Sequence, residues 1–185
     1  MKLRVFAVVV AGMLLVAASQ AQTFTGKLMG FQESPAVVSA GTGTVRITID
    51  GDRINYELTF SGLEGGAVGA AHIHVGQRNV SGGVSVFFCN TPPAVNPPPQ
   101  PTHNGGAEPV PHCDAAQPFT GFWTAADVVG PKAQGVDPAD PNRLARLIQA
   151  IKAGRSYANV HTVRSPTGEI RGQLVRLRDD DDDSN

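Results

Sequence analysis

The segment 45-VRITIDGDRINYELTF-60 decides the fold, because its side chains alternate between apolar and polar on both sides of Asp50-Gly51. A period of two places the apolar residues on one face of a strand, whereas a helix would scatter them around its circumference. Glycine tolerates the positive φ that hairpin turns require. The segment therefore predicts two antiparallel strands with Gly51-Asp52 between them, and Asp50-Gly51 is a favoured pair for the turn. The residues expected to face a core are Val45, Ile47, Ile49, Ile54, Tyr56, Leu58 and Phe60.

Shorter runs predict further strands at residues 24–28, 71–75, 84–88, 156–163 and 169–177. Pro166 and Gly168 punctuate the last two runs, which are therefore expected to form a second hairpin. If this hairpin pairs symmetrically about Pro166, His161 lies opposite Arg171.

One amphipathic helix is expected before the second hairpin. Asp140 can cap its start, Pro141 suits the first helical position, and Gly154 suits its end. The apolar stripe of this helix consists of Leu144, Leu147, Ile148 and Ile151. Several short strands with one short helix indicate an all-β domain, folded as a two-sheet antiparallel sandwich of Greek-key type.

Both ends of the sequence are expected to lie outside the domain. Residues 1–21 combine an early positive charge, an apolar run and small residues at the end, which is the layout of a secretory signal peptide. No later segment is long and apolar enough for a membrane span. Residues 179–185 begin with five aspartates and are expected to form a disordered acidic tail. The domain is thus predicted to occupy residues 22–178, in a secreted or periplasmic protein.

Charge and composition argue against nucleic acid as a partner. Removal of residues 1–21 takes away Lys2 and Arg4, so the formal charge falls from −1 to −3. Without the five aspartates of the tail the body carries about +2, since −3 plus 5 is +2. This small excess indicates no basic patch, and 6% aromatic residues provide few platforms for stacking bases.

Cys89 and Cys113 are predicted to form a disulfide, because an exported chain meets an oxidising compartment. This bond would close the proline-rich loop 89–113, whose composition is incompatible with a helix or a central strand. Two free thiols, or a metal site that includes His112, are the alternatives. His103 and His112 lie in this loop and are expected to be solvated.

The segment Ala71-His72-Ile73-His74-Val75-Gly76 carries the most distinctive chemistry of the chain. On a strand, His72 and His74 point to the same side, and His161 lies on another predicted strand. If the two strands meet, three imidazoles can bind copper or zinc. The alternative is that these histidines hydrogen-bond to loop backbone and hold the rim of the sheet.

Glu169 and Arg171 are two residues apart and share one face of their predicted strand. Their expected use is ion pairing or the capping of neighbouring loops. The sequence has no Gly-x-Ser-x-Gly elbow, phosphate-binding loop or dinucleotide fingerprint, and oxidised cysteines are not nucleophiles. A non-enzymatic protein is therefore favoured over an enzyme.

Three blocks of the sequence, at residues 71–76, 157–162 and 168–174, together resemble the CHRD (chordin-type) domain family. The resemblance extends over residues 23–177. The polar signature residues of the last two blocks are Asn159, Thr162, Glu169 and Arg171. Domains of this family occur in chordin, an extracellular protein that binds growth factors, and in many exported microbial proteins.

Three functions are compatible with these observations. The resemblance implies a non-enzymatic extracellular binding module, with an unknown protein or glycan as its partner. The histidines suggest a copper- or zinc-binding metalloprotein, and the third possibility is a structural protein of an envelope or matrix. A metal site requires the three imidazoles to meet at one point, whereas a structural role requires each ring to bond to backbone. A binding module requires an exposed patch or groove elsewhere.

Overall fold

The computed structural model describes residues 20–93 and 99–178. The expected acidic tail, and all but the last two residues of the expected signal peptide, lie outside these ranges. The strands are β1 (Gln22–Met29), β2 (Thr42–Asp50), β3 (Arg53–Ser61), β4 (Val68–Val75), β5 (Gly83–Asn90), β6 (Thr102–His103), β7 (Glu108–Pro109), β8 (Phe119–Trp123), β9 (Ser156–Thr162), β10 (Ile170–Gln173) and β11 (Val175–Arg176). The helices are α1 (Arg143–Lys152) and the 3₁₀ turns η1 (Gly30–Gln32), η2 (Ala125–Asp127) and η3 (Lys132–Gln134). In the described part of the chain, no helix is long and apolar enough to cross a membrane.

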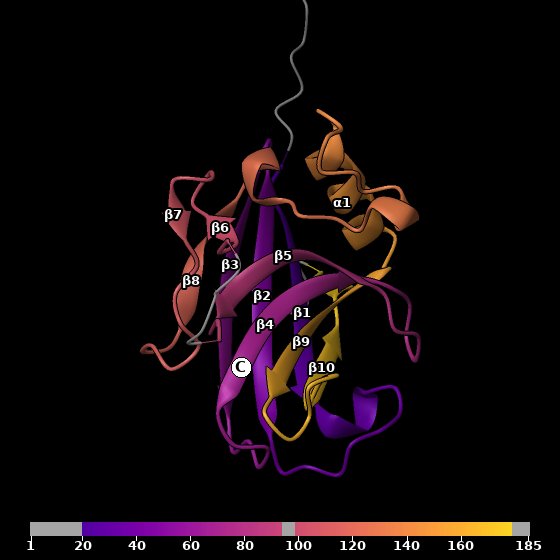
Figure 1. The fold of residues 1–185 in the computed structure, drawn as a ribbon. Helices are drawn as coiled ribbons and strands as arrows, with labels where there is room; N and C mark the ends of the chain where they lie inside the picture. The colour runs from indigo at the N-terminus through magenta and orange to yellow at the C-terminus, as the bar shows by residue number, and fades with distance from the viewer. Residues whose placement is uncertain (1–19, 94–98, 179–185) are drawn as a thin grey trace, which may run out of the picture.

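All the long strands belong to one antiparallel sheet with the order β5-β4-β9-β10-β1-β2-β3-β8, and β11 also pairs with β1. The sheet folds over on itself, so that β4 and β5 lie across β1, β2 and β3 (Figure 1). The two ends of the sheet approach each other where the Trp123 indole donates a hydrogen bond of 2.9 Å to the Phe87 carbonyl. The expected all-β antiparallel sandwich is confirmed, and its two layers are halves of one continuous, nearly closed sheet.

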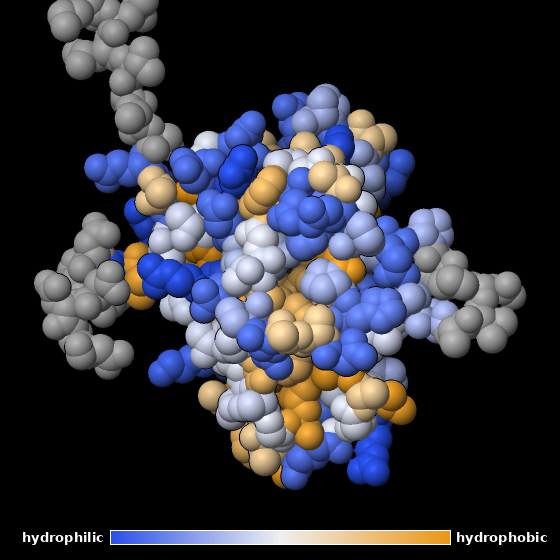
Figure 2. Space-filling view, turned by 90° about the vertical axis from the view of Figure 1, so that its left-hand side faces the viewer, coloured by the Kyte–Doolittle hydropathy of each residue, from blue (hydrophilic) through white to orange (hydrophobic). Residues whose placement is uncertain are grey.

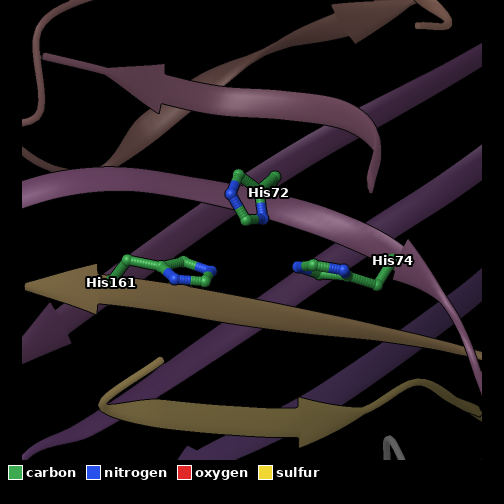
Figure 3. Close-up of side chains that lie close together, drawn as sticks. All are labelled: His72, His74 and His161. Carbon is green, nitrogen blue, oxygen red and sulfur yellow. The ribbon is translucent and has the colours of Figure 1, made fainter. Parts of the chain in front are cut away.

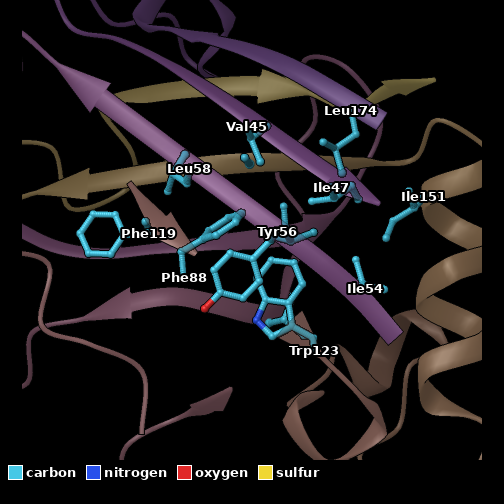
Figure 4. Close-up of a cluster of buried hydrophobic side chains, with 14 of the residues drawn as sticks. Val45, Ile47, Ile54, Tyr56, Leu58, Phe88, Phe119, Trp123, Ile151 and Leu174 are labelled. Carbon is cyan, nitrogen blue, oxygen red and sulfur yellow. The ribbon is translucent and has the colours of Figure 1, made fainter. Parts of the chain in front are cut away.

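The hairpin of β2 and β3 is confirmed. Asp50 pairs with Arg53, so Gly51-Asp52 forms the two-residue loop at which the alternation stops in the sequence. Gly51 has a φ of 58°, which glycine adopts without strain. The apolar face of this hairpin packs against β5, β8 and α1 in the core shown in Figure 4, where Tyr56 stacks on Trp123 at 4.2 Å.

The predicted helix forms as α1 but begins two residues after Pro141. The reason is the side chain of Asp140, which accepts hydrogen bonds from the Asn142 backbone at 2.8 Å and from Arg146 Nε at 2.6 Å. These bonds hold a separate turn ahead of the first helical residue. Gly154, with a φ of 67°, follows the last turn as predicted. The buried face of the helix consists of Leu144, Leu147 and Ile151.

The second hairpin forms in a different register from the symmetric one. Arg171 pairs with Asn159, so it does not lie opposite His161. Thr162 and Ser165 exchange two backbone hydrogen bonds of 3.3 and 3.1 Å, so the chain reverses before Pro166. A second turn from Ser165 to Gly168 then takes up the remaining loop residues. Turn geometry thus sets the register that the apolar pattern alone left open.

The structure corrects two further expectations. The strand β8 was not predicted, and it pairs with β3 across more than 50 residues of sequence. His103 is not solvated, because its side chain is buried and its Nδ1 lies 2.7 Å from the Tyr56 hydroxyl. His112 is exposed, as expected.

Cys89 and Cys113 form the predicted disulfide, with their Cα atoms 5.0 Å apart. The bond joins β5 to the end of the proline-rich loop, 24 residues later. Because this link restricts the unfolded chain, we expect the Cys89→Ala/Cys113→Ala variant to lose about 3 kcal/mol in free energy of unfolding. Urea denaturation measures this loss, and the reduced wild-type protein serves as the control. A loss below about 1 kcal/mol in both would show that the loop needs no covalent closure.

Candidate metal centre

Strand alternation brings His72, His74 and His161 to one side of the sheet. Ala71 and Ile73 point into the core. His72 and His74 alternate with them along β4 and therefore point away from the core. In the pairing of β4 with β9, His72 lies opposite Asn159, and His161 is the next residue of β9 on the same face. One potential ligand atom from each histidine lies within 4.8 Å of the other two. Figure 3 shows the rings of His74 and His161 directed toward each other, with His72 beside the gap.

Backbone carbonyls fix the orientation of two of the rings. His74 Nδ1 lies 2.8 Å from the carbonyl of Gly82, and His161 Nδ1 lies 2.9 Å from the carbonyl of Pro166. A carbonyl only accepts hydrogen bonds, so each Nδ1 carries the proton and each Nε2 carries a free lone pair. This is the arrangement by which proteins orient metal-binding histidines.

Each of the three rings retains a buried nitrogen without a hydrogen-bond partner among the described residues. These atoms are His72 Nδ1, His74 Nε2 and His161 Nε2. A buried acceptor that is left unpaired costs folding free energy, so native proteins rarely retain one without a ligand or a functional reason. The three rings that carry these atoms meet in one cluster, where a bound cation would give buried nitrogens a partner.

The environment keeps these histidines neutral. Burial lowers the pKa of His72 well below its usual value, and the neighbouring His161 and His74 lower it further. Burial also lowers the pKa of His74 to about 4, against the opposing effect of its bond to Gly82. The pKa of His161 is lowered by burial, although its bond to Pro166 acts in the other direction. Neutral imidazole is the form that binds metal ions, so protons do not compete strongly at neutral pH.

Aromatic side chains enclose the cluster. Tyr157 stacks on His74 with the two rings nearly parallel, at a centroid distance of 4.7 Å. The ring of Phe87 meets His72 edge-on at 4.9 Å. The guanidinium of Arg171 lies 3.4 Å from the centre of the Tyr157 ring, and its Nη2 donates to the Gln77 carbonyl. The side chains of His74, Tyr157 and Arg171 therefore form one ordered stack beside the candidate ligands.

The polar signature residues have structural partners around the site. Asn159 Nδ2 donates to Glu33 Oε1 at 2.6 Å. The carboxylate of Glu169 accepts four hydrogen bonds, from the backbone of Glu64 and Gly65 and from the hydroxyls of Ser39 and Thr162. Of the two expected uses of Glu169, the structure therefore shows the capping of a neighbouring loop.

Sequence reasoning did not identify Glu33, which is buried beside Asn159. Burial raises the pKa of Glu33 to about 7, although its bond to Asn159 and the charge of Arg171 both lower it. Its neighbours in the sequence, Gln32 and Ser34, give no pattern that distinguishes a buried carboxyl from an exposed one. The signal is spatial, because β9 and the loop after β1 are brought together only by the fold.

This raised pKa predicts a pH-dependent stability. The folded state binds more protons than the unfolded state between pH 4.5 and 7, so this group reduces stability as the pH rises through that window. Glu33→Gln removes this dependence while keeping the oxygen that accepts from Asn159. With an allowance for solvent screening, we expect the variant to gain about 2 kcal/mol over wild type between pH 4.5 and 8. Urea midpoints across that range measure the difference, and parallel curves would contradict the prediction.

Apolar residues are exposed on the face of the molecule that Figure 2 shows, where they gather in the middle and lower part among polar residues. A shallow groove of about 390 Å³ crosses one end of β1, β2 and β3, and its lining includes Met29 and Phe60. None of the histidines or polar signature residues lines this groove. It offers a surface to a partner without indicating what that partner is.

Comparison with known proteins agrees with the resemblance. The chain matches the CHRD domain family over residues 24–174, a range that contains the three histidines and the four polar signature residues. Searches of curated proteins and of solved structures gave no significant match. On the strength of this match over most of its length, the chain belongs to the CHRD domain family.

Proposed function

We propose that this CHRD domain is a secreted binding module whose ligand is a copper or zinc ion, held by His72, His74 and His161. Membership of the family supports an extracellular-type binding module in general, and the metal ion specifies what is bound. The observation that carries the proposal is the geometry of the cluster, in which three potential ligand atoms lie within 4.8 Å of one another. Secretion is supported by the signal-like residues 1–21 and by the disulfide.

A purely structural role for the histidines explains fewer of their contacts. Such a role would bond each imidazole to the backbone, and His74 and His161 do each make one such bond. Their other nitrogens, however, are buried without partners and lie in the same cluster as His72. A metal ion accounts for both halves of the pattern, because outer hydrogen bonds orient the rings whose inner nitrogens bind it.

The test is metal titration of the purified protein, beside two variants. Wild type is expected to bind about one copper or zinc ion per chain. His72→Ala/His74→Ala removes two ligands and should abolish stoichiometric binding, whereas His112→Ala removes an exposed histidine outside the cluster and should change nothing. Circular dichroism establishes whether each variant is folded. Absence of bound metal from wild type, or equal binding by the double variant, would refute the proposal.

A further inference from the structure

We infer that the three-histidine site selects a monovalent ion, Cu(I), in preference to Cu(II) and Zn(II). This inference rests on the proposed metal site and specifies which ion occupies it. It follows from the charge of the ligands, from the exclusion of water and from the electrostatics of the surrounding residues.

The ligand set carries no negative charge. Among the described residues the cluster consists of three histidines, without a carboxylate or thiolate. Both cysteines of the chain are joined in the disulfide and have no free thiolate to offer. A divalent ion in this site would keep its full charge of +2, whereas Cu(I) would keep +1. The cost of burying an ion grows with the square of its charge, so the divalent ion loses about four times as much solvation energy.

The site is also poorly placed to give an ion a water ligand. His74 Nε2 and His161 Nε2 are both buried, and rings of Tyr157 and Phe87 pack against two of the imidazoles. Zn²⁺ with three histidine ligands takes a water or hydroxide as its fourth ligand, which also supplies a negative charge. Cu(I) is a softer ion that is stable with three ligands and does not need the fourth.

Among residues 20–93 and 99–178, those beside the site supply no unpaired negative charge. Arg171 stacks on the same Tyr157 ring that stacks on His74, which places a cation near the cluster. The carboxyl of Glu33 accepts a hydrogen bond from Asn159, and burial disfavours its charged form. When it is ionised it faces the guanidinium of Arg171, which its charge offsets before that of a metal ion. A divalent ion consequently meets neutral ligands, with no unpaired anion in this network.

Competition titrations test the selectivity directly. Cu(I) is measured anaerobically against a chromogenic Cu(I) chelator, and Cu(II) and Zn(II) are measured against chelators of known affinity. The Kd of wild type for Cu(I) is expected to be at least about 100-fold below its Kd for either divalent ion. A Cu(II) or Zn(II) affinity equal to or above that for Cu(I) would overturn the inference while leaving the metal site itself intact. Failure to bind any of the three ions would refute the proposed function as well.

A designed variant provides a second test. Phe87→Glu introduces a carboxylate beside His72, and Phe87→Gln is its neutral control of nearly equal size. The glutamate is expected to tighten Cu(II) and Zn(II) binding at least about tenfold and to change Cu(I) binding less than about threefold. A tenfold shift of the relative affinity toward Cu(II) lowers the reduction potential of the bound copper by about 59 mV. Equal effects of Glu and Gln on all three ions would contradict the role of charge.

Discussion

Replacement of Glu169 by alanine is expected to destabilise the folded domain by about 4 kcal/mol, because the buried carboxylate accepts four hydrogen bonds. Its side chain is only 1% exposed, and it ties the loop after β3 to the loop before β10. A Cβ on Gly65 would overlap the Thr162 hydroxyl and a carboxylate oxygen of Glu169, so the close approach of backbone to carboxylate depends on a glycine there. Without the carboxylate, the buried donors of this loop would be left unpaired.

Glu169→Gln gives a graded measurement if the alanine variant does not fold. Each carboxylate oxygen accepts one backbone N–H, from Glu64 or from Gly65. In either orientation the amide nitrogen of glutamine would therefore face a backbone donor, and we expect a loss of about 2 kcal/mol. Glu57→Gln, at an exposed position of β3, is the control and should cost less than about 0.5 kcal/mol. Urea denaturation measures both losses. A loss for Glu169→Gln as small as that of the control would show that the carboxylate does not hold the loop after β3.

Saturation with metal is expected to stabilise the domain by about as much as Glu169→Ala destabilises it. An ion that binds only the folded state adds about 4 kcal/mol to the free energy of unfolding when its free concentration is about a thousand times its Kd. The three buried imidazoles are converging and neutral in the folded protein, whereas the unfolded chain separates them by up to 89 residues, from His72 to His161. Thermal unfolding with and without Cu(I) or Zn(II) measures this gain.

The variants separate this effect from nonspecific binding of metal to the protein. His112→Ala should show the same gain as wild type, and His72→Ala/His74→Ala should show almost none. Burial lowers the pKa of all three histidines, so below about pH 6.5 the unfolded chain binds protons that the folded protein does not. The free energy of unfolding of the metal-free protein should therefore fall as the pH drops below that value. An equal metal-induced shift in the double variant would place the binding elsewhere on the chain.

Much of the fold could be predicted from local patterns. The alternation in residues 45–60 predicts the hairpin, and the apolar stripe beginning at Leu144 predicts α1, because both patterns are set by the geometry of a single element. The face shared by His72 and His74 could be predicted for the same reason. The disulfide was predicted from the expected export of the chain rather than from local geometry.

What could not be predicted depends on contacts between distant segments. The register of the second hairpin was wrong because two consecutive turns, rather than one turn centred on Pro166, connect its strands. The strand β8 and the buried His103 depend on pairing with β3 and on Tyr56, which no local pattern encodes. Glu33 joins the site because the loop after β1 meets β9. Long-range packing therefore determines the surroundings of the site, although its three histidines are visible in the sequence.

The most direct test of the metal centre is X-ray absorption spectroscopy of the copper-loaded protein. A metal ion held by the three histidines should show a first shell of three nitrogen atoms at about 2.0 Å, with the outer-shell scattering of imidazole rings, and His72→Ala/His74→Ala should lose this signature. A first shell dominated by oxygen, or one that persists in the double variant, would contradict it. The metal would then be bound at the surface, and His72, His74 and His161 would be structural residues of the sheet.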